Sequence, residues 1–377
     1  MACVQHAPRP SRPAWTTHGE GVDPVISDAS NVAARIRRQR DDVARRVTDE
    51  FLERHPDWVE RYGARARQFG EEDARFHVDF LAAAVLGRSK QAFEEYARWT
   101  AALLSARGIA AAFLEENLEQ VGRAVEGLLD VEEAAWVRDV VDAGRRAAVE
   151  PVVGATDQGA LAAATSVFVE AALVGDRRAA WTVVSEALRE GVPMLGLYRD
   201  VLQEAQYELG RRWASNRITV TQEHTATAVT QFVLARLYEK IPRPRRVRGT
   251  VVVTGVGGEQ HSLGAQIVAD TLEMDGWDVR YLGTAMPHQG IVDAVGDARA
   301  DIVAISATML FCLPAVEDLV QRVRERFPAG RPRILLGGGA FVATPDLWRS
   351  LGVDGQGTNL DEAMTLARDV HPGPSRS

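Results

Sequence analysis

The sequence has few cysteines, no excess of positive charge and no long apolar run. Cys3 and Cys312 are its only cysteines among 377 residues, too few for a disulfide framework or a zinc site, and they indicate a reducing compartment. The formal net charge of −8 gives no support to nucleic-acid binding. No apolar run approaches the roughly 18 residues of a membrane span, and the opening MACVQHAPRPSRPAW lacks the apolar core of a signal peptide. We therefore expect a cytoplasmic protein without a membrane anchor.

Periodicity and helix breakers divide the rest of the chain into segments. Residues 1–27 are rich in proline and small polar residues, which predicts a disordered tail. In residues 28–150 apolar positions recur at spacings of three and four, which predicts an all-helical domain of five or six helices. Four amphipathic stretches then predict an antiparallel four-helix bundle over 157–240, with helices expected at 157–174, 177–190, 194–213 and 219–240.

The pattern changes again at residue 249. Short β-branched runs alternate with helical stretches such as GAQIVADTLEMDG; the runs are TVVVTGV, DVRYLG, DIVAISA, RILLGGG and a weaker GVDGQGT. This alternation predicts a flavodoxin-like, doubly wound parallel sheet over 249–370, whose ligands bind beyond the carboxyl ends of the strands. The expected fold class is therefore α plus α/β.

The turn after the first expected strand reads GGEQHSLGAQ, residues 257–266. A G-x-G-x-x-G turn lets backbone amides approach a pyrophosphate, but here Gln260 and His261 place bulky side chains where the phosphate would lie. Dinucleotide binding is therefore disfavoured. We expect His261 to project above the sheet with Glu259 placed to orient it, as a carboxylate often orients a metal-bound histidine. Taken alone, a histidine in a loop is more often hydrogen-bonded or solvent-facing than a metal ligand.

Three short motifs stand in the expected strand-end loops: Glu259-x-His261-x-x-Gly264, Ser306-x-Thr308 and Gly337-Gly338. Together they resemble the cobalamin-binding domain, whose usual signature is D-x-H-x-x-G, S-x-L and G-G. The resemblance implies that His261 is the lower axial cobalt ligand in place of the cofactor's dimethylbenzimidazole. The displaced nucleotide tail would then run into a slot between strands. Glu259 stands where the family usually has Asp, a departure that occurs in light-sensing members. The implied cofactor contacts are Glu259, His261, Ser262, Gly264, Ser306, Thr308, Gly337 and Gly338.

The bundle contains a second motif, Trp213 followed after nine residues by Glu223 and His224. Taken alone, these are a helix-end core residue and an acid suited to a helix N-terminus. Beside a cobalamin domain, W-x9-E-H resembles the light-sensing CarH-like subclass, which binds adenosylcobalamin. The resemblance implies that Trp213 caps the adenosyl group, that Glu223 hydrogen-bonds it and that His224 lies close by. Directly after the Trp, that subclass has a histidine that ligates cobalt after photolysis. This chain has Ala214 there. The cobalt ligand in the lit state is therefore His224, water or none.

CarH-like regulators begin with a DNA-reading helix-turn-helix, which residues 28–150 do not resemble. Their arginines are interspersed with aspartates and predict a solvated face rather than a nucleic-acid surface; these are Arg35, Arg37, Arg38, Arg40, Arg45 and Arg46. No direct nucleic-acid contact is expected.

An all-helical segment before a W-x9-E-H core instead resembles the photocobilins, which bind biliverdin as well as cobalamin. A bilin requires an apolar slot with aromatic walls and cations for its propionates. The candidates are His77 as a lactam donor, Tyr96 and Trp99 as ring walls and Arg98 as a propionate partner, although each alone is more often ordinary core or surface. Non-covalent binding is favoured over attachment through Cys3.

These resemblances imply a light-sensing signalling protein rather than an enzyme. Photolysis of bound adenosylcobalamin is expected to change conformation or oligomeric state, with a homo-oligomer and a downstream protein as partners. The alternative is a corrinoid protein that carries methyl groups for a methyltransferase system, which needs neither the first helical domain nor a bulky Trp213. A cobalamin-dependent mutase subunit would work with a TIM-barrel domain that this chain lacks.

Overall fold

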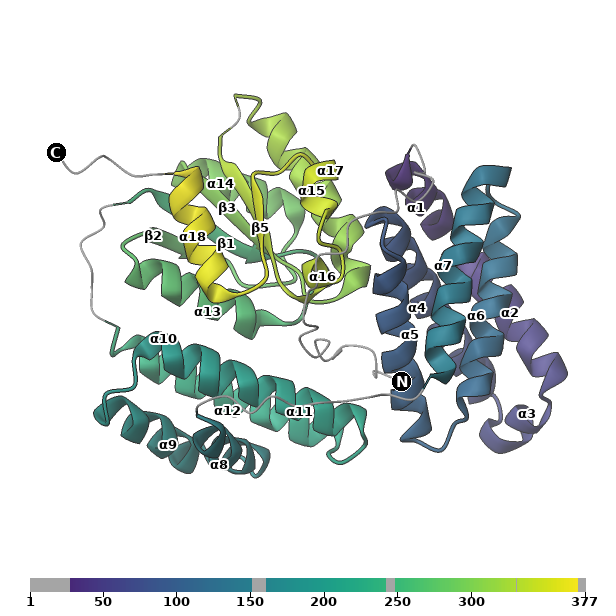
Figure 1. Ribbon diagram of the computed structural model, residues 1–377, viewed down its shortest axis with the longest axis horizontal. Helices are drawn as coiled ribbons and strands as arrows, with labels where there is room; N and C mark the ends of the chain where they lie inside the picture. The colour runs from purple at the N-terminus through teal and green to yellow at the C-terminus, as the bar shows by residue number, and fades with distance from the viewer. Residues whose placement is uncertain (1–27, 151–160, 242–247, 330, 372–377) are drawn as a thin grey trace. The chain divides into compact units, whose positions relative to one another are not determined.

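A computed structural model describes residues 28–150, 161–241, 248–329 and 331–371. The chain forms two compact units, residues 1–155 and 156–377, and the elements of each are labelled in Figure 1. The expected tail at 1–27 and the junction between the two helical segments, residues 151–160, lie outside the described residues. Within the described residues, no helix combines the length and the apolarity that crossing a membrane requires.

The first unit is all-helical, as predicted. Its described part contains seven helices rather than five or six, because the six-residue α3 is separate and Gln39, at φ −99° and ψ 7°, ends one helix and starts another. Helices α5 and α7 approach closely at Gly144, where a side chain would meet the ring of Phe93 at 2.5 Å. The helices are α1 Ala29–Arg38, α2 Arg40–Arg54, α3 Asp57–Tyr62, α4 Arg65–Leu86, α5 Lys90–Ser105, α6 Ala111–Glu126 and α7 Val131–Val149.

The second unit begins with the helical bundle. The third expected helix runs from Met194 to Ala214, and its middle turn widens into a π-helix. Such π-helical turns are rare and are frequently found at functional sites. The segments are α8 Ala162–Leu173, α9 Arg177–Arg189, α10 Met194–Gly196, η1 Leu197–Gln203, α11 Glu204–Ala214 and α12 Val220–Tyr238.

The sheet of the second unit has five parallel strands in the order β2-β1-β3-β4-β5. The predicted fold class is confirmed, the weak fifth strand included. The strands are β1 Thr250–Gly255, β2 Asp278–Tyr281, β3 Ile302–Ser306, β4 Arg333–Gly337 and β5 Gly355–Gly357. The order reverses between β1 and β3, and open α/β sheets bind ligands at this switch point. The flanking helices are α13 Ser262–Met274, α14 His288–Ala298, η2 Leu310–Cys312, α15 Leu313–Arg326, α16 Gly339–Val342, α17 Leu347–Ser350 and α18 Leu360–Val370.

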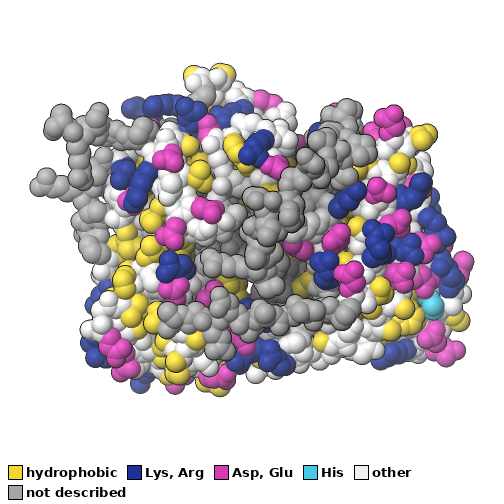
Figure 2. All heavy atoms as spheres, in the orientation of Figure 1, with side chains coloured by type: hydrophobic (Ala, Val, Ile, Leu, Met, Phe, Trp, Pro, Cys, Tyr) yellow, Lys and Arg dark blue, Asp and Glu magenta, His cyan; other side chains and the backbone are white. Residues whose placement is uncertain are grey.

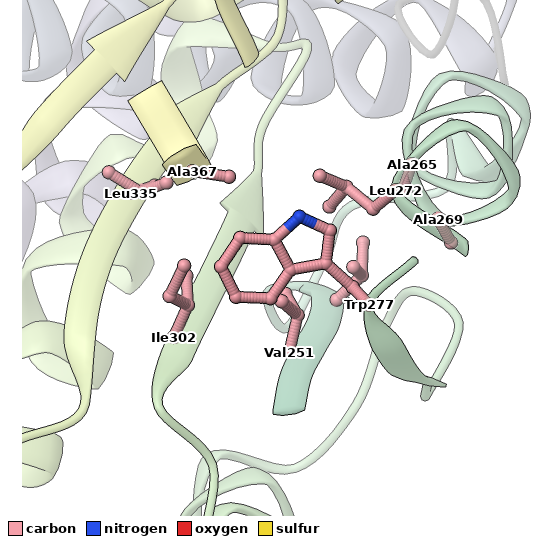
Figure 3. Packing of buried hydrophobic residues seen from close by; sticks show 9 residues of the cluster. Val251, Ala265, Ala269, Leu272, Trp277, Ile302, Leu335 and Ala367 are labelled. Atoms are coloured by element: carbon pink, nitrogen blue, oxygen red, sulfur yellow. The ribbon is translucent and has the colours of Figure 1, made fainter. Parts of the chain in front are cut away.

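Trp277 anchors the apolar core beside the sheet. Its indole is fully buried among side chains of β1, β3 and β4 and of the helices α13 and α18, as Figure 3 shows. Burying an aromatic side chain of this size contributes on the order of 3 kcal/mol. This core holds α13 against the strands, so the residues at the start of α13 have a fixed position at the sheet edge.

Hydrogen bonds also join the bundle to the sheet domain within the second unit. The Tyr198 hydroxyl, on η1, donates to Asp270 on α13 at 3.0 Å, and the Tyr238 hydroxyl donates to Glu273 at 2.9 Å. Tyr198 and Asp270 are both buried. Helix α13 is therefore tied to two different helices of the bundle.

Candidate functional site

Small residues lie side by side where the strands end. In the parallel register, Gly255 of β1 pairs with Ser306 of β3, Ser306 pairs with Gly337 of β4, and Gly337 pairs with Gly357 of β5. The S-x-T and G-G motifs, some 30 residues apart in sequence, thus become neighbours, because parallel strands bring their carboxyl ends to one edge. The predicted slot for a nucleotide tail stays a prediction at this edge.

The loop after β1 places Glu259 against His261. Glu259 Oε1 lies 2.6 Å from His261 Nδ1 and accepts a hydrogen bond from the His261 backbone N–H at 2.8 Å. The Glu259 side chain is fully buried, whereas His261 is half-buried directly before α13. A carboxylate on Nδ1 fixes the ring orientation and the tautomer, so Nε2 is the nitrogen that is oriented for metal ligation.

The second carboxylate oxygen of Glu259 reaches the loop after β3. Glu259 Oε2 accepts from the Thr308 N–H at 2.6 Å and from the Met309 N–H at 3.4 Å. Burial acts to raise the pKa of Glu259, but hydrogen bonds and charge from His261 and the Thr308 N–H outweigh it and hold the pKa below its ordinary value. One ionised carboxylate therefore joins the two loops on either side of the switch point.

Cys312 lies beside the same carboxylate. Burial, followed by the charge of Glu259 and a hydrogen bond to it, raises the pKa of the Cys312 thiol, and the residue is buried at the end of η2. A protonated thiol can donate to Glu259 but is a poor nucleophile. Cysteine count alone gave no signal for this placement, since it depends on the fold of the β3–α15 connection.

Two glycines of the motifs, Gly338 and Gly264, differ in whether a side chain would fit at their position. At Gly338, with φ 107°, a side-chain carbon would stand 2.3 Å from the Ala307 carbonyl oxygen, so the fold itself requires glycine there. At Gly264, in the first turn of α13, no atom of the described residues lies within 4 Å of where a side-chain carbon would stand. Internal packing therefore does not explain Gly264, and an exposed backbone beside His261 fits close approach of a large flat cofactor. The residues present fit a cobalt corrinoid, which needs one protein ligand.

The W-x9-E-H residues divide into buried and exposed members. Trp213 is 2% exposed and Glu223 is 4% exposed, whereas the His224 side chain is 57% exposed. Glu223 accepts a hydrogen bond from Thr227 at 2.9 Å and lies 3.8 Å from His224 Nδ1. Their roles toward an adenosyl group stay predictions, and Ala214, buried at the end of α11, provides no ligand.

The four bilin candidates lie on α4 and α5 of the first unit. His77 and Tyr96 are buried, and His77 Nδ1 lies 2.6 Å from the Tyr96 hydroxyl. Burial lowers the pKa of His77 to about 4, so its imidazole is neutral. Arg98 pairs with Glu94 at 3.3 Å and with Glu150 at 3.6 Å. Trp99 is half-buried, with its ring centroid 6.4 Å from that of Tyr96. The arrangement clusters three of the candidates, and their role stays a prediction.

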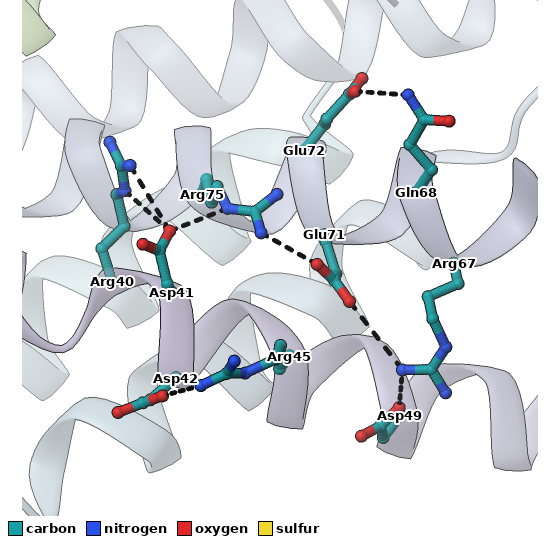
Figure 4. Close-up of polar contacts among 10 residues, drawn as sticks. All are labelled: Arg40, Asp41, Asp42, Arg45, Asp49, Arg67, Gln68, Glu71, Glu72 and Arg75. Carbon is teal, nitrogen blue, oxygen red and sulfur yellow. Dashed lines mark hydrogen bonds and ion pairs between the residues drawn. The ribbon is translucent and has the colours of Figure 1, made fainter.

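Several arginines of the first unit are paired with acids. Figure 4 shows Arg75 between Asp41 and Glu71, each at 2.9 Å, and Arg67 on Asp49 at 2.5 Å. Arg35 pairs with Glu133, and Arg40 with Asp79 at 3.1 Å. On the face seen in Figure 2, Lys or Arg and Asp or Glu side chains are intermixed over this unit. This is the mixed-charge surface expected of a solvated face.

Comparison with known proteins assigns both parts of the second unit. Residues 249–365 match the B12 binding domain, and residues 167–238 match a second B12 binding domain family. The matched stretches contain the Glu259–His261 pair and the W-x9-E-H motif, respectively. Cobalamin is therefore the cofactor indicated for this unit.

The curated relatives match only part of the chain. The HTH-type transcriptional repressor CarH of Myxococcus xanthus is 31% identical over 160 residues, which cover 42% of this chain and 52% of that protein. Dimethylamine corrinoid protein 3 of Methanosarcina mazei is 27% identical over 122 residues, 32% of this chain and 72% of that protein. The chain thus spans about half the length of the repressor.

Among solved structures, the monomethylamine corrinoid protein of Methanosarcina barkeri superposes with a TM-score of 0.51 and 19% identity. The match covers 56% of this chain and all of that chain. This likeness supports the fold: a helical bundle followed by a parallel sheet.

Proposed function

We propose that this protein is a light-sensing signalling protein that binds adenosylcobalamin. The observation that carries the proposal is the Glu259–His261 pair at the switch point of the sheet, at 2.6 Å, in a chain that also carries W-x9-E-H. His261 Nε2 is the lower cobalt ligand. Glu259 holds the ring in place and, being ionised, favours the Nδ1–H tautomer.

The bound cofactor supplies a cobalt–carbon bond that light breaks. The chain's own residues position that bond and respond to it. Trp213 provides an apolar wall, and Glu223 provides a carboxylate acceptor. Helix α13 begins at Ser262, directly after His261, and is hydrogen-bonded to the bundle through Tyr198 and Asp270 at 3.0 Å. A shift of His261 is therefore transmitted to the bundle, with a change in oligomeric state or in a partner contact as the output.

The decisive experiment is an absorption spectrum of the full-length holoprotein in the dark and after green light. A light-dependent spectrum with a changed oligomeric state on size exclusion supports the proposal. The His261→Ala variant should bind cobalamin more weakly and lose the spectrum of histidine ligation. Gln260→Ala is the matched control, because Gln260 is exposed between the paired residues. Equal spectra and affinities for His261→Ala and the parent would refute the cobalt assignment.

Gly264 offers an independent test of where the corrin lies. Alanine has space at this position and favours a helix by up to about 1 kcal/mol over glycine, so Gly264→Ala should leave the apoprotein as stable as the parent or slightly more stable. A corrin packed over the start of α13 should nevertheless bind this variant more weakly, as measured by titration. Unchanged affinity would place the corrin elsewhere.

A methyl-carrying corrinoid protein is the second candidate, favoured by the identity with dimethylamine corrinoid protein 3. The two functions differ at the upper face of the corrin. A light sensor should prefer adenosylcobalamin over methylcobalamin, and Trp213→Ala should reduce that preference because a large apolar wall is lost. Equal affinity of the parent for both cofactors would favour the methyl carrier.

We further propose that the first unit binds biliverdin non-covalently. The support is the cluster of His77 on α4 with Tyr96 and Trp99 on α5, the helix that also carries Arg98. When biliverdin is added to the full-length protein, the red absorption band of biliverdin should shift and sharpen. Arg98→Gln should weaken this response, whereas Arg123→Gln, an exposed arginine paired with Glu119 at 3.8 Å, should not. If the biliverdin spectrum does not change in the presence of cobalamin, the first unit is a dimerisation or partner-binding module.

A further inference from the structure

A second histidine–carboxylate pair lies at the same edge of the sheet, outside the cobalamin signature. His288 is the first residue of α14 and follows the loop after β2. Since β2 pairs with β1, this loop lies beside the loop that carries Glu259 and His261. The sequence motif gave no signal for His288, because its position depends on the strand order.

The imidazole of His288 contacts a carboxylate through its Nδ1 atom. Its Nδ1 lies 2.5 Å from Asp318 Oδ2, and Arg322 Nε donates to the same oxygen at 2.8 Å. The hydrogen bond from Arg322, with that from His288, lowers the pKa of Asp318 despite some burial, so the carboxylate is ionised. An ionised acceptor on Nδ1 favours the Nδ1–H tautomer, in which the lone pair of the imidazole is on Nε2.

Among the residues that the structure describes, His288 Nε2 is buried and has no hydrogen-bond partner. The side chain is only 15% exposed. Nε2 lies 3.7 Å from where a side-chain carbon on Gly257 would stand. At the neighbouring Gly258, no atom of the described part of the chain lies within 4 Å of where a side-chain carbon would stand. A buried acceptor without a donor is costly and requires an explanation. Here the acceptor lies beside Gly257, in the loop that leads to His261.

We propose that His288 is a cofactor-binding residue whose Nε2 accepts a hydrogen bond from a peripheral carboxamide of the corrin ring. This inference rests on the proposed cobalamin binding. The corrin periphery carries primary amides, whose N–H groups are the donors that a neutral imidazole nitrogen accepts. Gly257 has no side chain beside Nε2, Asp318 orients the imidazole that receives the amide, and Arg322 holds Asp318.

The experiment is a titration of full-length apoprotein with adenosylcobalamin in the dark, followed by absorbance. His288→Ala should weaken binding roughly tenfold to a hundredfold, as expected for one hydrogen bond to a buried group. His288→Gln retains an acceptor oxygen and should recover part of the loss. Gln289→Ala is the matched control, since Gln289 is the exposed next residue and its side chain donates to Asp293 on the same helix. Circular dichroism checks that each variant is folded.

A second ligand separates the corrin ring from the nucleotide tail. Cobinamide has the ring amides but lacks the tail, so His288→Ala should lose a similar factor with cobinamide. A loss confined to cobalamin would assign His288 to the tail phosphate and overturn the amide contact. Unchanged affinity for both ligands would overturn the inference entirely. Failure of the parent protein to bind cobalamin would refute the proposed function instead.

Nitrogen NMR of histidine-labelled protein supplies a readout that does not depend on affinity. His288 should show the Nδ1–H tautomer in the apoprotein, and its Nε2 resonance should move when cobalamin is added. Asp318→Asn should shift the tautomer balance and weaken binding without removing the imidazole. An Nε2–H tautomer in the parent apoprotein would contradict the proposed acceptor role.

Discussion

Replacing Asp270 by asparagine tests the link between helix α13 and the bundle. Asp270 is 7% exposed and accepts from the Tyr198 hydroxyl at 3.0 Å. Burial, only partly offset by this hydrogen bond and augmented by the nearby Glu273, raises the pKa of Asp270 from 3.8 to about 6. Asparagine keeps the shape and an acceptor oxygen for Tyr198 while removing the charge.

The sign and size of the effect follow from this shift. Between about pH 4 and pH 6 the folded chain binds more protons at Asp270 than the unfolded chain, so the free energy of unfolding falls as pH rises through this window. The difference between the pKa of Asp270 in the folded chain and its ordinary value corresponds to about 3 kcal/mol of lost stability once the carboxyl is ionised. Asp270→Asn should therefore stabilise α13 by about 3 kcal/mol above pH 7, with the gain vanishing below pH 4.

Hydrogen exchange measured by mass spectrometry on peptides of α13 gives the local opening free energy, after correction for intrinsic rates. Tyr198→Phe is the companion variant. It leaves Asp270 buried without its donor and should cost about 2 kcal/mol at pH 7.5. A gain for Asp270→Asn that is equal at pH 4 and pH 7.5, or no gain at either, would refute the reasoning.

Three further outcomes are expected. Gly338→Ala should destabilise the second unit by about 3 kcal/mol or more in urea denaturation, because its side chain would meet the Ala307 carbonyl at 2.3 Å; a cost below about 1 kcal/mol would contradict that contact. Cys312 should resist alkylation by iodoacetamide in the native protein and react after denaturation, since burial raises its pKa; rapid native labelling would refute this. The His77 pKa of about 4 lies below the ordinary 6.5, so stability of the first unit should rise by about 3 kcal/mol from pH 4 to pH 6.5. His77→Gln should remove that rise, and proton NMR should show titration near pH 4.

The order of helices and strands was predictable from the sequence because each element has its own local residue pattern. β-branched runs such as TVVVTGV and helical periodicity such as that of α13 are set by residues close together in sequence. The extra division at Gln39 and the π-helix at Leu197–Gln203 were not predicted. Both are small backbone adjustments within stretches whose apolar spacing remains helical, so periodicity does not reveal them.

The motifs of the candidate site and its local Glu259–His261 pair were predictable, whereas its long-range contacts were not. Glu259 and His261 stand two residues apart, so their pairing at 2.6 Å follows from a single loop. The bond from the Thr308 N–H to Glu259 at 2.6 Å spans 49 residues and exists only because β1 and β3 are adjacent. The spacing of the motifs in the sequence does not predict that β1 and β3 are adjacent.

The sequence by itself determined the fold class, the position of the cobalamin-type motifs and the mixed charge of the first unit, since these depend on local pattern and composition. Tertiary structure alone decided that Cys312 is hydrogen-bonded to Glu259 and that Tyr198 donates to Asp270. It also decided that His288 lies beside Gly257. Each of these contacts joins segments brought together by strand order and helix packing. Long-range contacts of this kind form only when the apolar faces of separate elements are buried against one another, and no local pattern encodes them.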